Sequence, residues 1–328
     1  MDKFKNIAIY NTPFRRKIIE WIFFPLIRHN IRKRTSSCSL EYAGDRQQIE
    51  RDLSHGAFFM TNHRDIITDS IWLALLLHDR YRINLHPAIG NNLFGRRWIE
   101  WLVRSWRAFV VIRDGGIHDQ IANAKLLSEY IRLLRSSGES IWMAQRQGRA
   151  KDGNDLTEPA VLKMLTIDNK DFLTAIKQLN ICPVSINYEF DPCDYLKAEE
   201  MQQKRDNPNW KKTKEDDIRS MTTGLKGFKG RTVFRLTPSI NHDIDDLLAA
   251  DPTLPEQPRN TQIRCVCSII DQHIHSAYEL YSRGEAFEQY LNRQFDKCVL
   301  PDKDKQFMLA KMHEMYNNPD LNYKKAHA

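Results

Sequence analysis

Short apolar runs alternate with longer amphipathic stretches along most of the chain. The runs are bounded by polar or turn-forming residues and are rich in β-branched and aromatic side chains, which is typical of buried strands. They predict strands at residues 57–61, 83–89, 109–112, 140–144, 181–186 and 232–236. Helical patterns lie between several of them, at residues 65–78, 91–106 and 118–136. This alternation predicts an α/β sheet with helices on its faces.

The two ends of the chain have different patterns from the middle. Helical spacing of apolar residues predicts helices near the C-terminus at residues 261–282, 285–297 and from 302 onward. A polar, charged stretch at residues 199–214 is interrupted by Pro208 and predicts a surface excursion or an insertion. We therefore expect three parts: an N-terminal helical segment at residues 1–50, an α/β domain at 51–240 and a helical C-terminal extension at 241–328.

Residues 14–34 combine an apolar run with basic flanks. Trp21, Phe23 and Phe24 lie within the run, and lysines and arginines stand on both sides of it. Such a helix suits the headgroup region of an anionic membrane, where each nearby cation adds about 1 kcal/mol. The same pattern fits a helix that packs its apolar face onto its own domain. No apolar stretch reaches the roughly 20 residues that span a bilayer, so a peripheral contact is expected.

Composition narrows the class of protein. Of the 328 residues, 41% are hydrophobic and 28% are charged, which indicates a globular chain rather than a disordered one. The formal net charge of +7 favours anionic partners such as lipid headgroups or phosphorylated substrates. A nucleic acid would also suit this charge, but no recognisable binding module accompanies it, so none is expected as a partner.

The six cysteines are scattered, and no secretory signal precedes them. This favours a reducing cytoplasmic setting over a disulfide framework. Cys265 and Cys267, with His273 and His275 nearby, lack the usual spacing of zinc ligands. We expect these four residues to be partly buried helix residues, and we expect no metal site.

The segment Thr61-Asn62-His63-Arg64-Asp65 carries the clearest chemistry. It follows a predicted strand and opens a helix that also contains Asp69. Histidine titrates near neutral pH and can take a proton from a hydroxyl group. A carboxylate on the far ring nitrogen, from Asp65 or Asp69, would fix the tautomer. Alone, the segment fits equally well a helix-capping turn in which His63 is incidental.

Three further segments end on a predicted strand or just beyond one. They are Arg-Ala-Phe-Val-Val-Ile-Arg-Asp at 107–114, Ser-Ile-Trp-Met-Ala-Gln-Arg-Gln-Gly-Arg at 140–149 and Ile-Cys-Pro-Val-Ser-Ile at 181–186. In this order, and with the Asn62-His63 segment, they resemble the four blocks of the glycerolipid acyltransferases, the glycerol-3-phosphate and lysophosphatidate acyltransferase superfamily. The resemblance spans roughly residues 57–190 and implies a central mixed sheet flanked by helices.

The resemblance also assigns roles in the first two blocks. The family places an Asp five residues after the His, but Thr68 stands there and Asp69 follows. Either Asp69 or Asp65 takes the role, and Asp69 is preferred because a local bulge would bring it to the ring. Arg113 occupies the place of an arginine that binds the acceptor phosphate; a surface ion pair is the alternative.

The third block departs further from the family pattern. Gln147 stands where the family has Glu, and Arg149 follows Gly148 without a spacer. Arg146, Arg149 and Lys151 form a basic loop that suits a phosphate, or else a solvated surface loop. The resemblance implies that this loop and Asn62 contact the substrate.

The implied reaction is transfer of a fatty acyl group to a hydroxyl of a glycerol-phosphate or lysophospholipid acceptor. His63 would deprotonate that hydroxyl, and acyl-CoA or an acyl carrier protein would supply the activated thioester, so no cofactor or metal is expected. The expected location is the cytoplasmic side of a membrane surface. Thr68 and Gln147 also fit an alternative, a lipid-surface binding protein with this fold and impaired catalysis.

Overall fold

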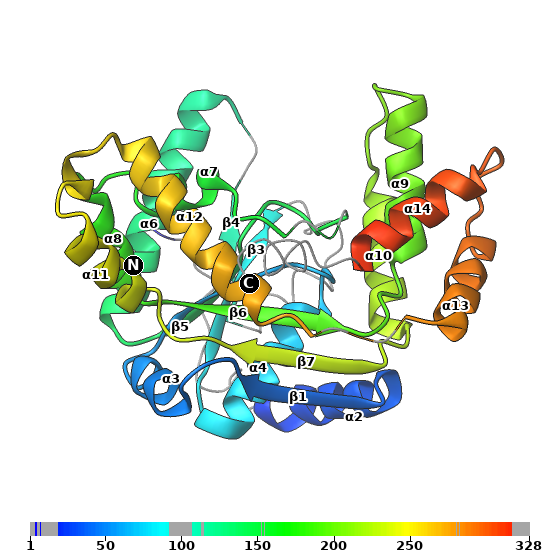
Figure 1. The fold of residues 1–328 in the computed structure, drawn as a ribbon, viewed down its shortest axis with the longest axis horizontal. Coiled ribbons are helices and arrows are strands. Elements are labelled where there is room, and N and C mark those ends of the chain that lie inside the picture. Colours follow the sequence, from blue (N-terminus) through cyan, green and yellow to red (C-terminus); the bar gives the residue numbers. More distant parts are fainter. Residues whose placement is uncertain are drawn as a thin grey trace.

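A seven-stranded mixed sheet forms the centre of the described part of the chain (Figure 1). The computed structural model describes residues 4, 7, 19–91, 107–112, 115–151, 153, 155–279, 281 and 283–316. The strands are β1 (Ser37–Tyr42), β2 (Phe58–Thr61), β3 (Leu85–Gly90), β4 (Phe109–Val111), β5 (Ser140–Ala144), β6 (Ile181–Tyr188) and β7 (Arg231–Leu236). Their order is β1-β7-β6-β2-β5-β3-β4, and every neighbouring pair is parallel except β6 and β7.

The predicted α/β class with a mixed sheet and flanking helices is confirmed. All six predicted strands are present with ends shifted by at most two residues. The sequence analysis missed β1, which pairs with β7 at the edge of the sheet. Only Leu40 is buried on this strand, so its short, half-exposed sequence lacks the apolar run that marks the inner strands.

Helices cover both faces of the sheet and one of its ends. The described helices are η2 (Ile19–Phe23), α2 (Phe24–Arg34), α3 (Arg46–Leu53), α4 (Thr68–Tyr81), α6 (Ile117–Ser136), α7 (Pro159–Leu165), α8 (Phe172–Leu179), α9 (Asp194–Asp206), α10 (Lys214–Lys226), α11 (Asn241–Ala250), η4 (Leu254–Glu256), α12 (Arg259–Ser276), α13 (Glu285–Asp296) and α14 (Lys305–Tyr316). The helix predicted at 91–106 lies outside the described residues, apart from Asn91.

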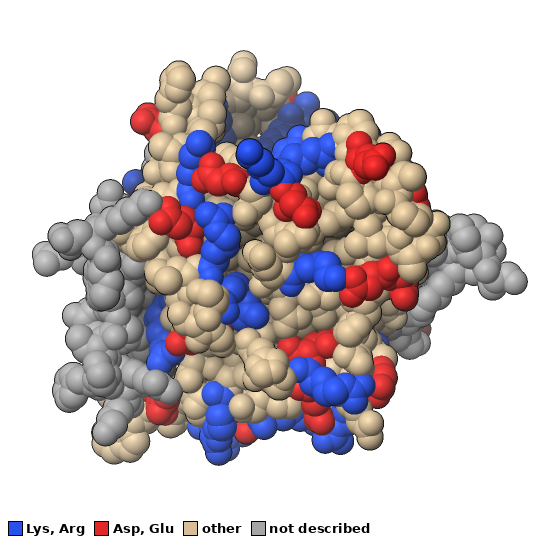
Figure 2. All heavy atoms as spheres, turned by 90° about the vertical axis from the view of Figure 1, so that its left-hand side faces the viewer, with Lys and Arg blue, Asp and Glu red and all other residues tan. Residues whose placement is uncertain are grey.

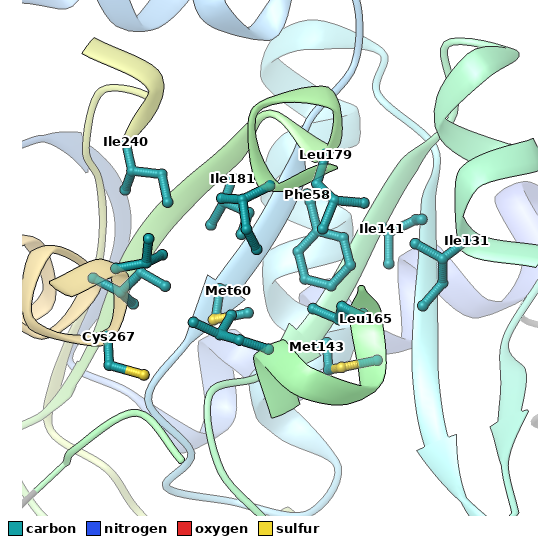
Figure 3. Close-up of a cluster of buried hydrophobic side chains, with 14 of the residues drawn as sticks. Phe58, Met60, Ile131, Ile141, Met143, Leu165, Leu179, Ile181, Ile240 and Cys267 are labelled. Atoms are coloured by element: carbon teal, nitrogen blue, oxygen red, sulfur yellow. The ribbon is translucent and has the colours of Figure 1, made fainter. Parts of the chain in front are cut away.

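The sheet separates two apolar cores because successive side chains of a strand point to opposite faces. Phe58 and Met60 of β2 point to one face, where α6, α7, α8 and α12 pack (Figure 3). Phe59 of β2 and Trp142 of β5 point to the other face, where α2, α3 and α4 pack. The molecule is therefore layered as helices, sheet and helices, and β2 is buried on both sides.

The predicted surface excursion at residues 199–214 is wrong over its first half. Residues up to Asp206 belong to α9, which packs against α13 and α14 around an apolar core that includes Leu196, Leu291 and Met308. We call these three helices the α9–α13–α14 group, which stands beyond one end of the sheet in Figure 1. The polar sequence misled because a buried charge within it is paired: a Glu200 oxygen lies 2.5 Å from Lys151 Nζ.

The expected boundaries at residues 50 and 240 run through packed structure. Strand β1 lies before residue 50 yet belongs to the central sheet. Helix α12 lies after residue 240, and its Ile263, Val266 and Ile270 share one core with β2 and β6. The first and last parts thus contribute to the same sheet and core as the middle part.

Helix α12 carries the cysteines and histidines considered above as metal ligands. Cys267 and His275 are buried, whereas Cys265 and His273 are partly exposed, and His273 Nε2 lies 2.8 Å from an Asp243 oxygen. Among the residues that the structure describes, no cluster of three or more His, Cys, Asp or Glu side chains is placed to hold a metal ion.

The N-terminal helical segment has one packed side and one exposed side. Phe24 and Ile27 are buried against the sheet's second core. Trp21 is 83% exposed and Leu26 58% exposed. None of the described helices is long and apolar enough to cross a membrane. The basic residues before this segment, at 15–17, lie outside the described residues.

Charges of both signs are interspersed on the face shown in Figure 2, the side of the molecule that carries α8 and α11. Lys177 pairs there with Asp245, and Lys125 Nζ lies 3.3 Å from an Asp168 oxygen. The net positive charge is therefore not gathered into one patch on this face.

Candidate active site

The chain leaves the sheet at the carboxyl end of β2 through Asn62. The Asn62 side chain imitates a further strand residue: its Oδ1 accepts from the backbone N–H of Ile186 at 2.7 Å, and its Nδ2 donates to the Ile186 carbonyl at 3.1 Å. Asn62 is fully buried. The substrate contact expected of Asn62 stays a prediction; in this structure its side-chain polar atoms hold the loop to β6.

His63 and Asp69 form a hydrogen-bonded pair at the start of α4. His63 Nδ1 lies 2.8 Å from Asp69 Oδ2. Since a carboxylate only accepts, Nδ1 carries the proton and Nε2 keeps its lone pair. The His63 side chain is 13% exposed, and the Asp69 side chain is fully buried. The imidazole edge also contacts the Trp142 ring at a centroid distance of 5.9 Å.

The loop before α4 accommodates the one-residue displacement of the acid. Asp65 Oδ1 accepts from the backbone N–H groups of Ile67 and Thr68, at 2.9 and 3.0 Å, and delays the start of the helix to Thr68. Asp69 Oδ2 also accepts from the backbone N–H groups of Arg64 and Asp65. The loop thus wraps around the Asp69 carboxylate and turns it toward the imidazole.

Asp65 does not contact the His63 ring, although the sequence left that role open for it. Its Oδ2 lies 3.6 Å from Lys229 Nζ, and both side chains are buried. Burial would raise the pKa of Asp65, but Lys229 and the two backbone N–H groups outweigh it and lower that pKa. Gly224 of α10 lies so close that an added Cβ would overlap the carboxylate. Asp65 therefore caps α4 and pairs with a buried lysine, and Asp69 alone of the two contacts His63.

The loop after β5, residues 145–151, folds over the backbone of His63. Gln145 N–H donates to the Thr61 carbonyl at 2.8 Å, and Ala150 N–H donates to the His63 carbonyl at 3.0 Å. Gly148, at φ +75°, supplies the left-handed residue that this turn requires. The first and third sequence blocks are therefore adjacent in space.

The polar and basic side chains of this loop differ in how deeply they are buried. Arg149 is 7% exposed, and its Nη2 donates to Ser220 Oγ on α10 at 3.1 Å. Burial alone would lower the pKa of Arg149, but nearby acidic groups, among them Asp191, raise it. Arg146 is half-buried, whereas the Gln147 side chain is exposed and the Gln147 backbone N–H donates to Glu158.

Lys151 is engaged by helix α9. Its Nζ lies 2.5 Å from a Glu200 oxygen. Burial disfavours the charged form of both groups and lowers the pKa of Lys151. At Glu200, burial would raise the pKa, but hydrogen bonds and charge from Lys151 and Lys204 outweigh it and lower the pKa of Glu200 to about 2. The predicted phosphate cradle is thus only partly open, because Arg149 and Lys151 already have protein partners. Arg113, the other predicted phosphate ligand, lies outside the described residues.

Arg64 connects the His63 loop to the C-terminal part of the chain. Its Nη2 lies 2.9 Å from Asp155 Oδ2, and its Nη1 donates to the Met315 carbonyl at 3.2 Å. Tyr278 also donates to Asp155 Oδ2. Burial would lower the pKa of Arg64, but Asp155 more than offsets it, so the guanidinium stays charged. Residues far along the chain therefore brace the loop that carries His63.

Sequence reasoning missed Tyr188, whose hydroxyl contacts Asp69. It also missed the buried Lys229 beside Asp65. Neither residue stands in a motif; a polar end to an otherwise apolar strand was the one available signal for Tyr188.

Residues 31–186 match the model of a protein family described as Acyltransferase. These residues form an acyltransferase-family domain. The resemblance drawn from the four sequence blocks is confirmed, and the matched residues contain strands β1 to β5, β6 up to Ile186, the His63 loop and the loop after β5. The family implies an acyl donor and a lipid acceptor as substrates. No curated protein matches the chain significantly.

Proposed function

We propose that this acyltransferase moves a fatty acyl group from an acyl thioester to a hydroxyl of a glycerol-phosphate or lysophospholipid acceptor in phospholipid synthesis, with His63 as general base. The observation that carries the proposal is the 2.8 Å hydrogen bond between His63 Nδ1 and Asp69. In the neutral imidazole this bond fixes the tautomer and leaves the Nε2 lone pair available to accept a proton.

In this reaction His63 Nε2 accepts the proton of the acceptor hydroxyl as its oxygen attacks the thioester carbonyl. The tetrahedral intermediate then expels the thiolate, and the imidazolium returns its proton to the thiolate or to solvent. The buried Asp69 carboxylate stabilises the imidazolium formed in between. The thioester is already activated, so the proposed step uses no metal or cofactor.

The acceptor class rests on the sequence blocks and on charge. The half-buried Arg146 lies two residues after β5, at the carboxyl end of a parallel strand, where α/β proteins bind ligands. Arg113 remains a phosphate ligand predicted from the sequence. Arginine pairs with phosphate through two parallel hydrogen bonds. The partners of Arg149 and Lys151 favour supporting roles for these two residues within the loop.

The alternative function, a lipid-surface binding protein with impaired catalysis, was suggested by Thr68 and Gln147. The reason based on Thr68 no longer holds. The displaced acid suggested a broken catalytic pair, yet Asp69 contacts the imidazole. Gln147 remains a departure, and its exposed amide can hydrogen bond to an acceptor hydroxyl without supplying a negative charge.

We also propose peripheral association with an anionic membrane on its cytoplasmic side. The exposed Trp21, Ile22 and Leu26 belong to the same helical segment as the exposed Arg32 and Lys33, a combination that favours the headgroup region. Trp21→Ala should weaken binding to vesicles with anionic lipid about tenfold, from the apolar area lost. Sedimentation with the vesicles measures this; unchanged binding would contradict the proposal, and Val299→Ala, at another exposed apolar residue, is the control.

A product screen tests the proposed activity. Purified protein is given mixed acyl thioesters with glycerol-3-phosphate, lysophosphatidate and other lysolipids, and mass spectrometry identifies the acylated product. We expect a phosphate-bearing acylglycerol from the wild type and strongly reduced product from His63→Ala. His242→Ala is the matched control, because His242 Nε2 also lies 2.9 Å from an aspartate, Asp52, but on the surface. Absence of acyl transfer to every acceptor would overturn the proposal.

A further inference from the structure

Tyr188 ends β6 just beyond the residues that match the family, and its hydroxyl contacts the candidate catalytic pair. It donates to Asp69 Oδ1 at 2.6 Å. Tyr188 is 6% exposed and Asp69 is fully buried, so water does not compete for this bond. The two Asp69 oxygens thus have separate tasks: Oδ2 accepts from His63 and Oδ1 accepts from Tyr188.

Thr68 completes a short chain of hydrogen bonds. Its Oγ1 lies 3.0 Å from the Tyr188 hydroxyl. Because the single proton of that hydroxyl goes to Asp69, Thr68 is the donor to Tyr188. The residue that stands where the family has its acid therefore reaches the displaced acid through Tyr188. Each donor in such a chain strengthens the next one.

The surroundings keep Tyr188 a neutral donor. Its ring packs on Trp72 at a centroid distance of 6.2 Å, and Lys229 Nζ lies 5.5 Å from the ring centre. Burial and the nearby Asp69 raise the pKa of Tyr188 well above its ordinary value. The hydroxyl therefore stays protonated at any pH at which the protein works.

Other charges around the pair come from several elements and are the same with or without the Tyr188 hydroxyl. They are Arg64 and Asp65 before α4, Arg149 and Asp155 between β5 and α7, Asp191 before α9, and Lys229 before β7. Removing one hydroxyl thus isolates its own effect on Asp69.

We propose that Tyr188 is a positioning residue that sets the proton affinity of His63 by sharing the negative charge of Asp69. A donor on Oδ1 reduces the charge that Oδ2 presents to the imidazolium. Without that donor the imidazolium is stabilised more, and His63 holds its proton to higher pH. As a base, His63 must be neutral, so the hydroxyl would keep more of the enzyme active near neutral pH. This role in catalysis rests on the proposed function; the effect on the ring does not.

Nuclear magnetic resonance of histidine-labelled full-length protein tests the inference. The His63 signal is assigned by its loss in His63→Gln, and its titration is compared between wild type and Tyr188→Phe. We expect the midpoint to move to higher pH by about 0.5 to 1 unit, within the range that one hydrogen bond to a carboxylate supplies. Thr68→Val, which keeps the side-chain shape, should move it the same way by less.

Tyr42→Phe is the matched control. Tyr42 also donates its hydroxyl to a carboxylate, Glu50 at 2.7 Å, but from the edge strand β1. We expect no change of the His63 midpoint in this variant. An unchanged or lowered midpoint in folded Tyr188→Phe would overturn the inference, and if that variant does not fold, the Thr68→Val result decides in the same way.

The pH dependence of acyl transfer separates this inference from the proposed function. If the enzyme is active, the acid limb of kcat/KM in Tyr188→Phe should move to higher pH by the same amount as the His63 signal. A shifted signal without acyl transfer by the wild type would refute the proposed function alone. Acyl transfer that depends on His63, with an unmoved signal in Tyr188→Phe, would refute the inference alone.

Discussion

The loops after β2 and after β5 follow neighbouring parallel strands and touch each other, but their charges are arranged differently. In the loop after β2, the Asp69 carboxylate is fully surrounded, and the His63 ring that it holds is partly exposed. In the loop after β5, Arg149 and Lys151 turn toward α10 and α9, where Ser220 and Glu200 bind them. In one loop a partly exposed imidazole rests on a buried acid, and in the other loop Arg149 and Lys151 are held by neighbouring helices.

This difference separates acid–base chemistry from acceptor binding. The first loop tolerates a displaced acid because Asp65 delays the helix and lets Asp69 take the required position. The second loop lacks the family's Glu at Gln147, and two of its cations have protein partners. General-base catalysis by His63 thus has firmer structural support than the identity of the acceptor.

The two aspartates of the first loop should differ most clearly. Asp69→Asn should lower kcat about 100- to 10,000-fold, because an amide can hold the wrong imidazole tautomer and does not stabilise the imidazolium. Asp65→Asn should instead lower the free energy of unfolding by about 3–5 kcal/mol, because it leaves Lys229 buried without its charge partner. Steady-state kinetics and urea unfolding of both variants measure these effects.

The opposite result would contradict the separate roles of the two aspartates. If Asp65→Asn remained as stable as wild type and lost as much kcat as Asp69→Asn, Asp65 would belong to the catalytic machinery. Glu50→Gln is a suitable control, since Glu50 is a half-exposed carboxylate bonded to Tyr42 on the sheet edge.

Arg149 tests whether the cations of the second loop stabilise the fold or bind the acceptor. Arg149→Gln should lower the free energy of unfolding by about 1–3 kcal/mol, the usual range for losing a buried polar contact. The acceptor KM of the folded variant should change less than about threefold, since the guanidinium bonds to Ser220. A tenfold higher KM at unchanged stability would mean that Arg149 turns outward and binds the acceptor.

The α9–α13–α14 group, which holds Lys151 through Glu200, should affect stability and its pH dependence rather than acyl transfer. Burial and the neighbouring Asp191 carboxylate raise the pKa of Asp194 on α9 to about 7. The folded state therefore binds this proton more tightly than the unfolded state, whose Asp pKa is about 3.9, and Asp194 increasingly destabilises the fold as pH rises from about 4 to 7.

Asp194→Asn removes that titration. We expect its thermal unfolding midpoint to exceed that of wild type by more at pH 8 than at pH 5, with the hydrogen bond from Tyr316 retained by the amide oxygen. Differential scanning calorimetry at the two pH values measures the change. An equal difference at both pH values would show that Asp194 does not titrate in this range.

The sequence was sufficient for the inner strands and for the order of the motifs. Continuous apolar runs identify buried parallel strands, and the carboxyl ends of such strands meet at one edge of the sheet. The half-exposed β1 has no such run. The polar sequence of α9 from residue 199 onward also predicted exposure, because the pairing of Glu200 with Lys151, 49 residues away along the chain, is a contact that no local pattern contains.

Side-chain roles within the site were predictable only in part. The displaced Asp69 could be preferred over Asp65 from family spacing, but the reason lies in the backbone N–H groups that Asp65 binds. Tyr188 lies 119 residues from Asp69 along the chain and in no motif. The inward turn of Arg149 depends on α10, which lies outside the matched family region.

The central claim concerns the imidazole of His63, and the rate of a single round of acyl transfer by His63→Ala tests it most directly. With enzyme in excess over the thioester, product release does not limit the measured rate. The account predicts a rate about 100- to 10,000-fold below wild type, with His242→Ala unchanged. A His63→Ala rate close to that of wild type would contradict it.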